Sequence, residues 1–94
     1  MSYVVRFLAG ALDDLGNIDQ VQQRLIIKKA NEVLSANPFP HSNVVKKLVG
    51  IRPPLSRLRI GDWRAFYEID GHEVLILAIA KKSRAERTIR RLRR

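Results

Sequence analysis

The sequence lacks cysteine and holds only two histidines among its 94 residues. Without cysteine, a disulfide framework and thiolate chemistry are excluded. His41 stands beside prolines and His72 stands in a predicted turn, so these two side chains cannot form a zinc site without further ligands. We therefore expect both histidines to lie in solvated loops, and we expect the protein to use no metal and no cofactor.

Long hydrophobic runs are missing as well. The longest apolar run covers residues 74–80 and is far shorter than the ~18 residues that indicate a membrane span. No secretory leader is recognisable, so we expect a soluble, cytoplasmic protein with no membrane partner. The length and the hydrophobic content of 46% suit one domain over residues 1–94, in which residues 82–94 form a basic C-terminal helix or tail.

Acidic residues are few compared with basic ones. The chain carries 18 Lys and Arg against 9 Asp and Glu, a net charge of +9. Residues 81–94 alone hold eight bases and one acid, which is +7, so the first eighty residues carry the remaining +2. The eight bases are Lys81, Lys82, Arg84, Arg87, Arg90, Arg91, Arg93 and Arg94. A patch with this charge attracts RNA, DNA, an anionic membrane or an acidic protein, and the charge alone does not distinguish between them.

The segment from Leu55 to Lys82 is typical of three consecutive antiparallel strands. Asp70-Gly71 separates two apolar stretches and is a strong hairpin signal. Because side chains alternate along a strand, every second residue of the middle strand should face the core, namely Trp63, Ala65, Tyr67 and Ile69. The opposite face then carries Arg57, Arg59 and Arg64. Such a face is either a solvated surface that keeps the sheet soluble or a binding site for an anion.

The residues before this segment predict one strand and two helices. Residues 2–8 are apolar on both faces of a strand, so we place that strand inside the sheet. Leucines at helical spacing predict a short helix that ends near Leu15, and an amphipathic helix follows from Ile18 to the break at Asn37-Pro38. The two helices should pack as a hairpin on the apolar face of the sheet. In that core we expect Tyr67 and Ile69 to be buried against Leu25, Val33 and Leu77.

Two further segments complete the expected fold. Residues 44–48 indicate a short strand or extended segment, followed by a turn at Arg52-Pro53-Pro54. Ser83 and Glu86 fit a capping box at the start of a last helix with a narrow apolar stripe. That stripe would be Ala85, Ile89 and Leu92, with Arg87, Arg90, Arg91 and Arg94 on the remaining surface. A flexible basic tail is the alternative for this region.

The expected fold class is therefore α+β. An N-terminal strand and an αα-hairpin precede the remaining strands, and the hairpin packs on one face of a mostly antiparallel, twisted sheet of four to five strands. A short basic helix ends the chain.

Three stretches of the chain resemble the RelE/ParE superfamily of type II toxin–antitoxin toxins. They are KKLVG at 46–50, SRLRIGDWRAFYEID at 56–70 and VLILAIAKK at 74–82, and the resemblance covers nearly the whole chain. It implies the RelE-like fold, with a helical hairpin on one face of the sheet and a basic concave surface on the other. RelE-like members cleave mRNA in the ribosomal A site, whereas ParE-like members poison DNA gyrase.

The resemblance implies a metal-independent endoribonuclease in which a 2′-OH of the RNA attacks the neighbouring phosphate. Arg64 matches the family arginine thought to hold the scissile phosphate, a role that suits the two parallel donors of a guanidinium. Removing its side chain should stop cleavage without unfolding the protein, because this face contributes little to the core. The other implied catalytic residues are Arg57, Arg59, Lys82 and Arg84. The implied RNA-binding residues are Lys46, Lys47, Lys81, Arg87, Arg90 and Arg91.

One position departs from the family pattern. The late catalytic tyrosine of the family falls at Thr88, which is too weak an acid to replace it, so another cationic group would have to assist proton transfer. Two alternatives to the endoribonuclease stay open, a ParE-like inhibitor of DNA gyrase and a nucleic-acid-binding member without catalysis.

The resemblance also implies partners: mRNA on the ribosome, or DNA gyrase in the alternative, and a cognate antitoxin with an acidic binding segment. The antitoxin would either cover Arg64 directly or displace the helix at residues 83–92. The thin apolar stripe of that helix favours its partial displacement.

Overall fold

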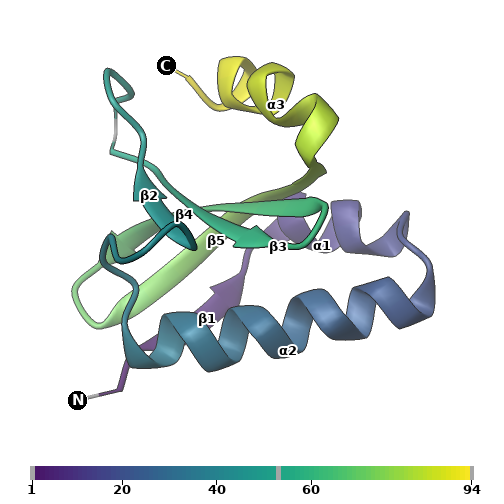
Figure 1. The fold of residues 1–94 in the computed structure, drawn as a ribbon, viewed down its shortest axis with the longest axis horizontal. Helices are drawn as coiled ribbons and strands as arrows, with labels where there is room; N and C mark the ends of the chain where they lie inside the picture. Colours follow the sequence, from purple (N-terminus) through teal and green to yellow (C-terminus); the bar gives the residue numbers. More distant parts are fainter. Residues whose placement is uncertain (1, 53, 94) are drawn as a thin grey trace.

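Five strands form one twisted sheet in the order β1-β5-β4-β3-β2, and helices cover both of its faces (Figure 1). The computed structural model describes residues 2–52 and 54–93, so Pro53 and Arg94 of the expected turn and tail lie outside the described residues. The strands are β1 (Val4–Phe7), β2 (Val45–Lys47), β3 (Ser56–Ile60), β4 (Trp63–Asp70) and β5 (Glu73–Lys81). The helices are α1 (Ala9–Gly16), α2 (Gln20–Ala36), the 3-10 turn η1 (Lys82–Arg84) and α3 (Ala85–Leu92). The expected α+β class is confirmed.

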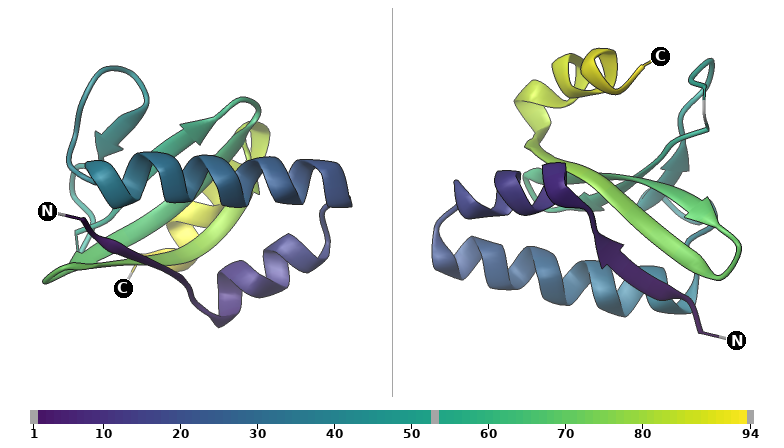
Figure 2. Two further views of the ribbon diagram at one scale, coloured as in Figure 1. Left: turned by 90° about the horizontal axis from the view of Figure 1, so that it is seen from below. Right: turned by 180° about the vertical axis from the view of Figure 1, so that it is seen from behind.

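The sheet separates two unequal helical layers. α1 and α2 form a hairpin along one face, and α3 lies across the other face (Figure 2). β1 is parallel to β5, and the other neighbouring strands are antiparallel. Over residues 2–52 and 54–93, each helix is too short or too polar to cross a bilayer.

The predicted alternation of side chains along β4 is confirmed. Tyr67 pairs with Ser56 of β3 and Ile76 of β5, and its side chain is fully buried on the face covered by the helical hairpin. Its hydroxyl donates a hydrogen bond of 2.6 Å to the carbonyl of Pro38. The turn between β4 and β5 includes Gly71, whose φ of 61° is a conformation that glycine adopts readily.

The larger core lies between the sheet and α2. Ile26, Ala30 and Leu34 follow one another at four-residue spacing, so they lie on one side of the helix, and all three are fully buried. Leu25, which we expected in this core, is 52% exposed. It lies about 100° further around the helix axis than Ile26 and therefore points to solvent.

The other expected core residues are only partly buried. Val33 and Ile69 pack against the core from its margin. Leu77 was also expected there, but the register shifts between Phe66 and Tyr67, and Leu77 is the extra residue of this β-bulge. A bulged residue has no directly opposed partner, so the strict alternation assumed from the sequence fails at this point.

β1 lies at an edge of the sheet, although we expected it inside. It pairs with β5 alone, and Val4 on its outer side is 49% exposed. Arg6 on the same side forms a salt bridge of 3.2 Å with Glu73. α1 begins directly after β1 and packs against β5, and among the described strands none pairs with the other edge of β1.

α1 approaches β5 closely at Gly10. A Cβ atom at this position would lie 2.9 Å from the carbonyl oxygen of Leu77, closer than a normal non-bonded contact. We expect Gly10→Ala to lower the free energy of unfolding by about 1–3 kcal/mol, because the backbone of α1 or β5 must shift. Urea denaturation measures this. Gly16→Ala is the matched control, since no atom outside its own helix and chain neighbours lies within 4 Å of the added Cβ. An equal loss in both variants would show that the close approach is unimportant.

α3 does not begin with the predicted capping box. Ser83 lies inside the 3-10 turn η1, and Arg84, the residue before α3, makes no capping hydrogen bond with its side chain. The chain turns back over the sheet directly after Lys81, and this turn includes Ser83. The predicted apolar stripe is confirmed: Ala85, Ile89 and Leu92 pack on a second, smaller core of Phe66, Ala78 and Ala80.

Candidate nucleic-acid interface

Three arginines lie on the face of the sheet that carries α3, as the sequence predicts. In the β3–β4 register, Arg57 is opposite Phe66 and Arg59 is opposite Arg64. Directly opposed residues of antiparallel strands point to the same face, and Phe66 lies in the core beneath α3. Lys46 of β2 is opposite Arg57 and therefore joins them. These four basic residues (Lys46, Arg57, Arg59 and Arg64) are termed the basic sheet face.

Arg64 is buried, with only 5% of its surface exposed. Its Nη1 donates hydrogen bonds to the carbonyls of Gly61, at 2.8 Å, and Trp63, at 2.9 Å. Burial and then the positive charges of the two neighbouring arginines hold the pKa of Arg64 below its ordinary value, and Asp62 partly opposes this. The expectation that Arg64 lies on a solvated face is wrong, because the residue is buried and its side chain is hydrogen-bonded to the β3–β4 turn.

We expect Arg64→Ala to lower the free energy of unfolding by about 1–2 kcal/mol. The variant loses two hydrogen bonds from a charged donor, and relief of the repulsion among the three arginines offsets part of that loss. Arg59→Ala, at an exposed position of the same face, should change the free energy by less than about 0.5 kcal/mol. The midpoints of urea unfolding compare the two variants, and equal midpoints would contradict a structural role for Arg64.

The basic sheet face has little counter-charge. Among residues 2–52 and 54–93, the salt bridge that the structure shows joins Arg6 to Glu73, at the β1 edge of the sheet. The Nε atom of Arg57 is buried and makes no hydrogen bond within the described residues. A buried donor without a partner is unfavourable, and an oxyanion is the group that matches a guanidinium best. The geometry of this face is therefore suited to phosphate groups.

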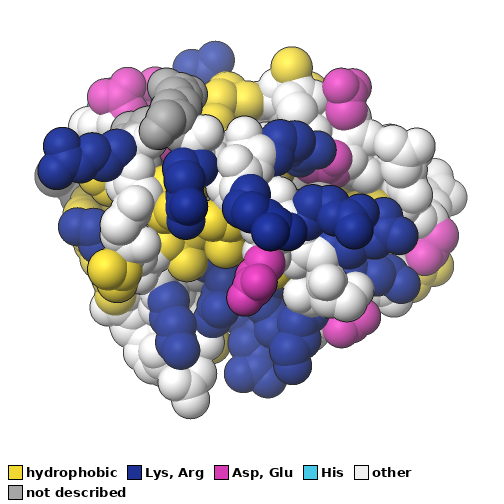
Figure 3. Space-filling view, turned by 90° about the horizontal axis from the view of Figure 1, so that it is seen from above, with side chains coloured by type: hydrophobic (Ala, Val, Ile, Leu, Met, Phe, Trp, Pro, Cys, Tyr) yellow, Lys and Arg dark blue, Asp and Glu magenta, His cyan; other side chains and the backbone are white. Residues whose placement is uncertain are grey.

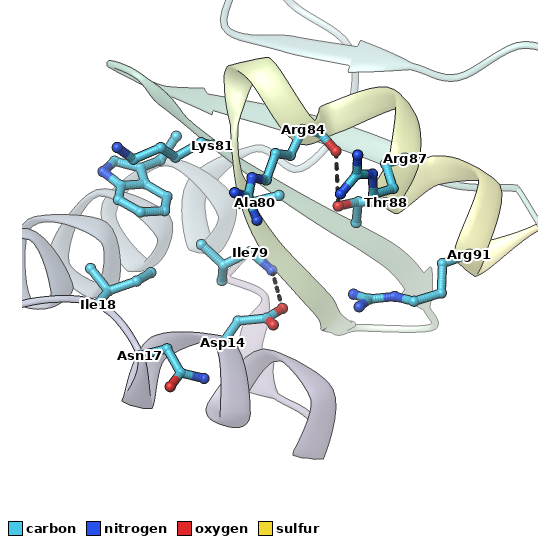
Figure 4. A pocket seen from close by; sticks show the side chains of 11 residues that line it. Asp14, Asn17, Ile18, Ile79, Ala80, Lys81, Arg84, Arg87, Thr88 and Arg91 are labelled. Atoms are coloured by element: carbon cyan, nitrogen blue, oxygen red, sulfur yellow. Dashed lines mark hydrogen bonds between the residues drawn. The ribbon is translucent and has the colours of Figure 1, made fainter.

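A second group of basic residues surrounds a cavity of about 440 Å³ between α1, the end of β5 and α3. Arg84, Arg87 and Arg91 line it from η1 and α3, and Lys81 lines it from β5 (Figure 4). Thr88 also faces this cavity but is only 8% exposed, and its hydroxyl donates to the carbonyl of Arg84 at 3.1 Å. The hydroxyl of Thr88 is therefore already hydrogen-bonded to the backbone at the start of α3.

The remaining predicted site residues belong to neither of these two groups. Lys47 pairs with Ser56, which places it on the face of the helical hairpin, away from the other predicted residues. Arg90 lines a groove beside Glu86 and the β2–β3 loop. Lys82 is exposed in η1, where its backbone N–H donates to the carbonyl of Asp62 at 2.8 Å. Seen from the side of α3, lysines and arginines cover much of the surface around a small apolar area (Figure 3).

Sequence reasoning missed three residues of the cavity wall: Asp14, Asn17 and Trp63. No motif or spacing marks Asp14 and Asn17, which the sequence shows only as polar residues at the end of a short helix. Trp63 was assigned to the core, and it does pack there in part. Its indole N–H donates to the side-chain carbonyl of Gln22 at 3.3 Å, and Nζ of Lys81 lies 5.7 Å from its ring centroid.

A family model described as the ParE toxin of the type II toxin–antitoxin system parDE matches residues 5–86. The chain belongs to this toxin family. The match covers strands β2 to β5, both helices of the hairpin and all of β1 except Val4, so it includes the whole basic sheet face. The family that the sequence resemblance implied is confirmed.

The fold of the toxin is also found in solved structures of RelE toxins. The toxin–antitoxin complex RelBE2 from Mycobacterium tuberculosis is 26% identical, with a TM-score of 0.72 over 86% of this chain and 99% of that chain. The archaeal RelE–RelB complex from Pyrococcus horikoshii OT3 is 25% identical, with a TM-score of 0.70 over 89% and 99%. A mutant of the E. coli toxin RelE in the free state shares the fold, at 20% identity and a TM-score of 0.62 over 99% and 95%. The comparison with curated proteins gives no match.

Proposed function

We propose that this toxin is a ribosome-dependent mRNA endonuclease that cleaves by attack of the RNA 2′-OH. The observation that supports the proposal is the basic sheet face: three arginines on adjacent strands, without a salt bridge to any described carboxylate, of which Arg64 is buried. Phosphoryl chemistry of this kind passes through a transition state with added negative charge on the phosphate oxygens. Fixed guanidinium donors stabilise that charge more than they stabilise the ground state.

The three arginines have different roles in this proposal. Arg64 holds the scissile phosphate, because its hydrogen bonds to the turn carbonyls fix its position before the substrate binds. Arg59 is exposed directly opposite Arg64 and contacts the same or the adjacent phosphate. Arg57, with its buried and unpartnered Nε, completes the set. A preformed arrangement of this kind requires little reorganisation during the reaction.

Proton transfer to the leaving 5′-oxygen requires an acid, and Thr88 is unsuitable because its hydroxyl is weakly acidic and bonds to Arg84. Lys82 and Arg84 are exposed in η1 next to the end of β5, and we assign them to phosphate binding and to this proton transfer. An ammonium group donates a proton more readily than a guanidinium, so Lys82 is the stronger candidate for the acid.

Expression of the toxin gene alone tests the proposed function. Primer extension on a cellular mRNA should show new 5′ ends within minutes of induction, and growth should stop. Supercoiling by DNA gyrase, assayed in parallel with the purified toxin, should be unaffected. Intact mRNA together with inhibited gyrase would assign the toxin to the gyrase alternative, and intact mRNA with active gyrase would leave a nucleic-acid-binding protein without catalysis.

We also propose a cognate antitoxin as partner, with an acidic segment that complements the +9 net charge of the toxin. Two of the similar structures are complexes of a RelE protein with a RelB protein, which supports such a pairing. The apolar contact of α3 with the sheet is small, since it joins Ala85, Ile89 and Leu92 to a cluster of Phe66, Ala78 and Ala80. An antitoxin helix with a broader apolar face therefore replaces α3 over Phe66 and Ala78.

Hydrogen exchange with and without the antitoxin tests this displacement. We expect amides of residues 83–92 to exchange faster in the complex than in the free toxin, because α3 loses its packing when the antitoxin takes its place. Amides of β4 should be protected further. If exchange in residues 83–92 stays the same and new protection is confined to residues 57–64, the antitoxin covers the basic sheet face directly and the displacement is wrong.

A further inference from the structure

The cavity between α1 and α3 has two chemically opposite walls. On one wall stand the three guanidiniums of Arg84, Arg87 and Arg91, and on the other stand the carboxylate of Asp14 and the amide of Asn17 (Figure 4). The structure shows no salt bridge across the cavity between the described residues of these walls. The cavity volume of about 440 Å³ lies within the range of roughly 300–1,000 Å³ typical of small-molecule sites.

The cationic wall is set by the helix. Arg84, Arg87 and Arg91 are spaced three and four residues apart, which places them in one row along the same side of η1 and α3. The side chain of Arg91 points into the space between the two walls (Figure 4). A row of guanidiniums without carboxylate partners is suited to a phosphate group, because the two parallel N–H donors of a guanidinium can both bind phosphate oxygens.

The opposite wall presents hydrogen-bond acceptors at a fixed position. Oδ2 of Asp14 accepts the backbone N–H of Ile79 at 2.8 Å, which holds the carboxylate against the part of β5 that β1 does not cover. Within the described residues, Oδ1 of Asp14 makes no hydrogen bond. The Nδ2 of Asn17 donates to the carbonyl of Asp13 at 3.1 Å, so the free acceptor of this wall is the carboxylate of Asp14. This wall therefore recognises a donor group.

We propose that this cavity binds one nucleotide of the RNA substrate, with the phosphate on Arg84, Arg87 and Arg91 and the exocyclic amino group of the base on Asp14. A nucleotide has an anionic end and a base edge, and three of the four RNA bases present an amino donor there. Adenine, cytosine and guanine each offer an exocyclic amino group to the carboxylate. Uracil has no such group, and its one donor on this edge, the ring N3–H, lies between two carbonyl oxygens that repel a carboxylate. The site therefore discriminates against uridine.

An acidic peptide fits the same cavity less well. Its carboxylates would satisfy the arginines but would bring a like charge toward Asp14, which is unfavourable in a partly enclosed site. The proposal rests on the proposed RNA-cleaving function for the identity of its ligand. Its test is a binding measurement that requires no cleavage, so the two can fail separately.

Titration of the purified, ¹⁵N-labelled toxin with AMP, CMP, GMP and UMP tests the site. We expect the three amino-bearing nucleotides to bind about tenfold more tightly than UMP, which is the effect of one charge-assisted hydrogen bond. The backbone amide of Ile79 and the indole N–H of Trp63 should shift on binding. Equal affinities for all four nucleotides would overturn the proposal, and so would shifts confined to the arginines of α3.

Asp14→Asn provides the sharper comparison, because its amide oxygen still accepts from Ile79 while its NH₂ group replaces the acceptor that faces the cavity. We expect this variant to bind UMP at least as tightly as the other nucleotides. Asp13→Asn is the matched control, as it removes one negative charge from an exposed neighbouring position, and it should keep the wild-type preference. Identical behaviour of the two variants would contradict base recognition by Asp14. If base preference is found but the toxin cuts no mRNA, the nucleotide site stands and the endonuclease function falls.

Discussion

Arg64→Ala is expected to lower the rate of mRNA cleavage by about 10²–10³-fold, the effect of removing one preorganised donor from a developing oxyanion. Arg64 is only 5% exposed and its guanidinium donates to two turn carbonyls, so its position is fixed before RNA binds. Single-turnover cleavage by the purified variant on programmed ribosomes measures this rate. Growth arrest on expression should disappear in parallel.

The loss of activity must be separated from the loss of stability expected for the same variant. Arg59→Ala removes an exposed guanidinium from the same face and should lower the cleavage rate by about tenfold or more while the urea midpoint stays unchanged. Arg24→Ala is the matched control, because Arg24 is an exposed arginine on α2, on the opposite side of the sheet. A decrease of the same size in Arg24→Ala would show that overall positive charge, and not the basic sheet face, drives cleavage.

Tyr67→Ala is expected to lower the free energy of unfolding by about 3–5 kcal/mol, as for other large-to-small changes in a packed core. The side chain is fully buried and contributes to the core between β4 and the helical hairpin. The change also leaves the carbonyl of Pro38 without its partner. Since small proteins are stable by only about 5–15 kcal/mol, much of the variant should be unfolded at 37 °C. Circular dichroism during urea unfolding measures the effect, and a loss below about 1 kcal/mol would contradict this packing.

Tyr67→Phe separates the hydroxyl from the ring. It should lower the free energy of unfolding by about 1–3 kcal/mol, because a buried acceptor loses its hydrogen bond. Burial raises the pKa of Tyr67 above its ordinary value, so the folded state favours the neutral phenol. This stabilisation is complete below about pH 10, the pKa of an unfolded tyrosine, and is lost as the pH rises above it. The stability difference between wild type and Tyr67→Phe should therefore narrow above pH 10.

Local rules predicted most of the fold. The Asp70-Gly71 turn and the alternation along β4 are properties of neighbouring residues, and they fix which face of the sheet holds Tyr67 and which holds Arg64. The edge position of β1 was not predictable in the same way, because a strand that is apolar on both sides resembles an interior strand. Its place depends on its pairing with β5, a strand far away in the sequence, and on the lack of a further described strand on its other edge.

The candidate site was predictable in its residue types but less so in its geometry. Alternation along two strands brought Arg57, Arg59 and Arg64 together correctly. The burial of Arg64 depends on a side chain that folds back onto the carbonyls of its own turn, and no pattern of residues reveals such a rotamer. The cavity wall with Asp14 depends on how α1 packs beside β5, which is a contact between residues 65 positions apart. Long-range contacts of this kind have no local signature.

Cleavage of a defined mRNA by the purified toxin, with and without ribosomes, tests the central claim most directly. The toxin, the mRNA and ribosomes halted at a known codon are combined, and the 5′ ends of the products are mapped by primer extension. If the basic sheet face cleaves mRNA on the ribosome, cuts appear in the A-site codon only when ribosomes are present, and Arg59→Ala greatly reduces them. Uncut mRNA in the presence of ribosomes, with a toxin that is folded by circular dichroism, would contradict the account.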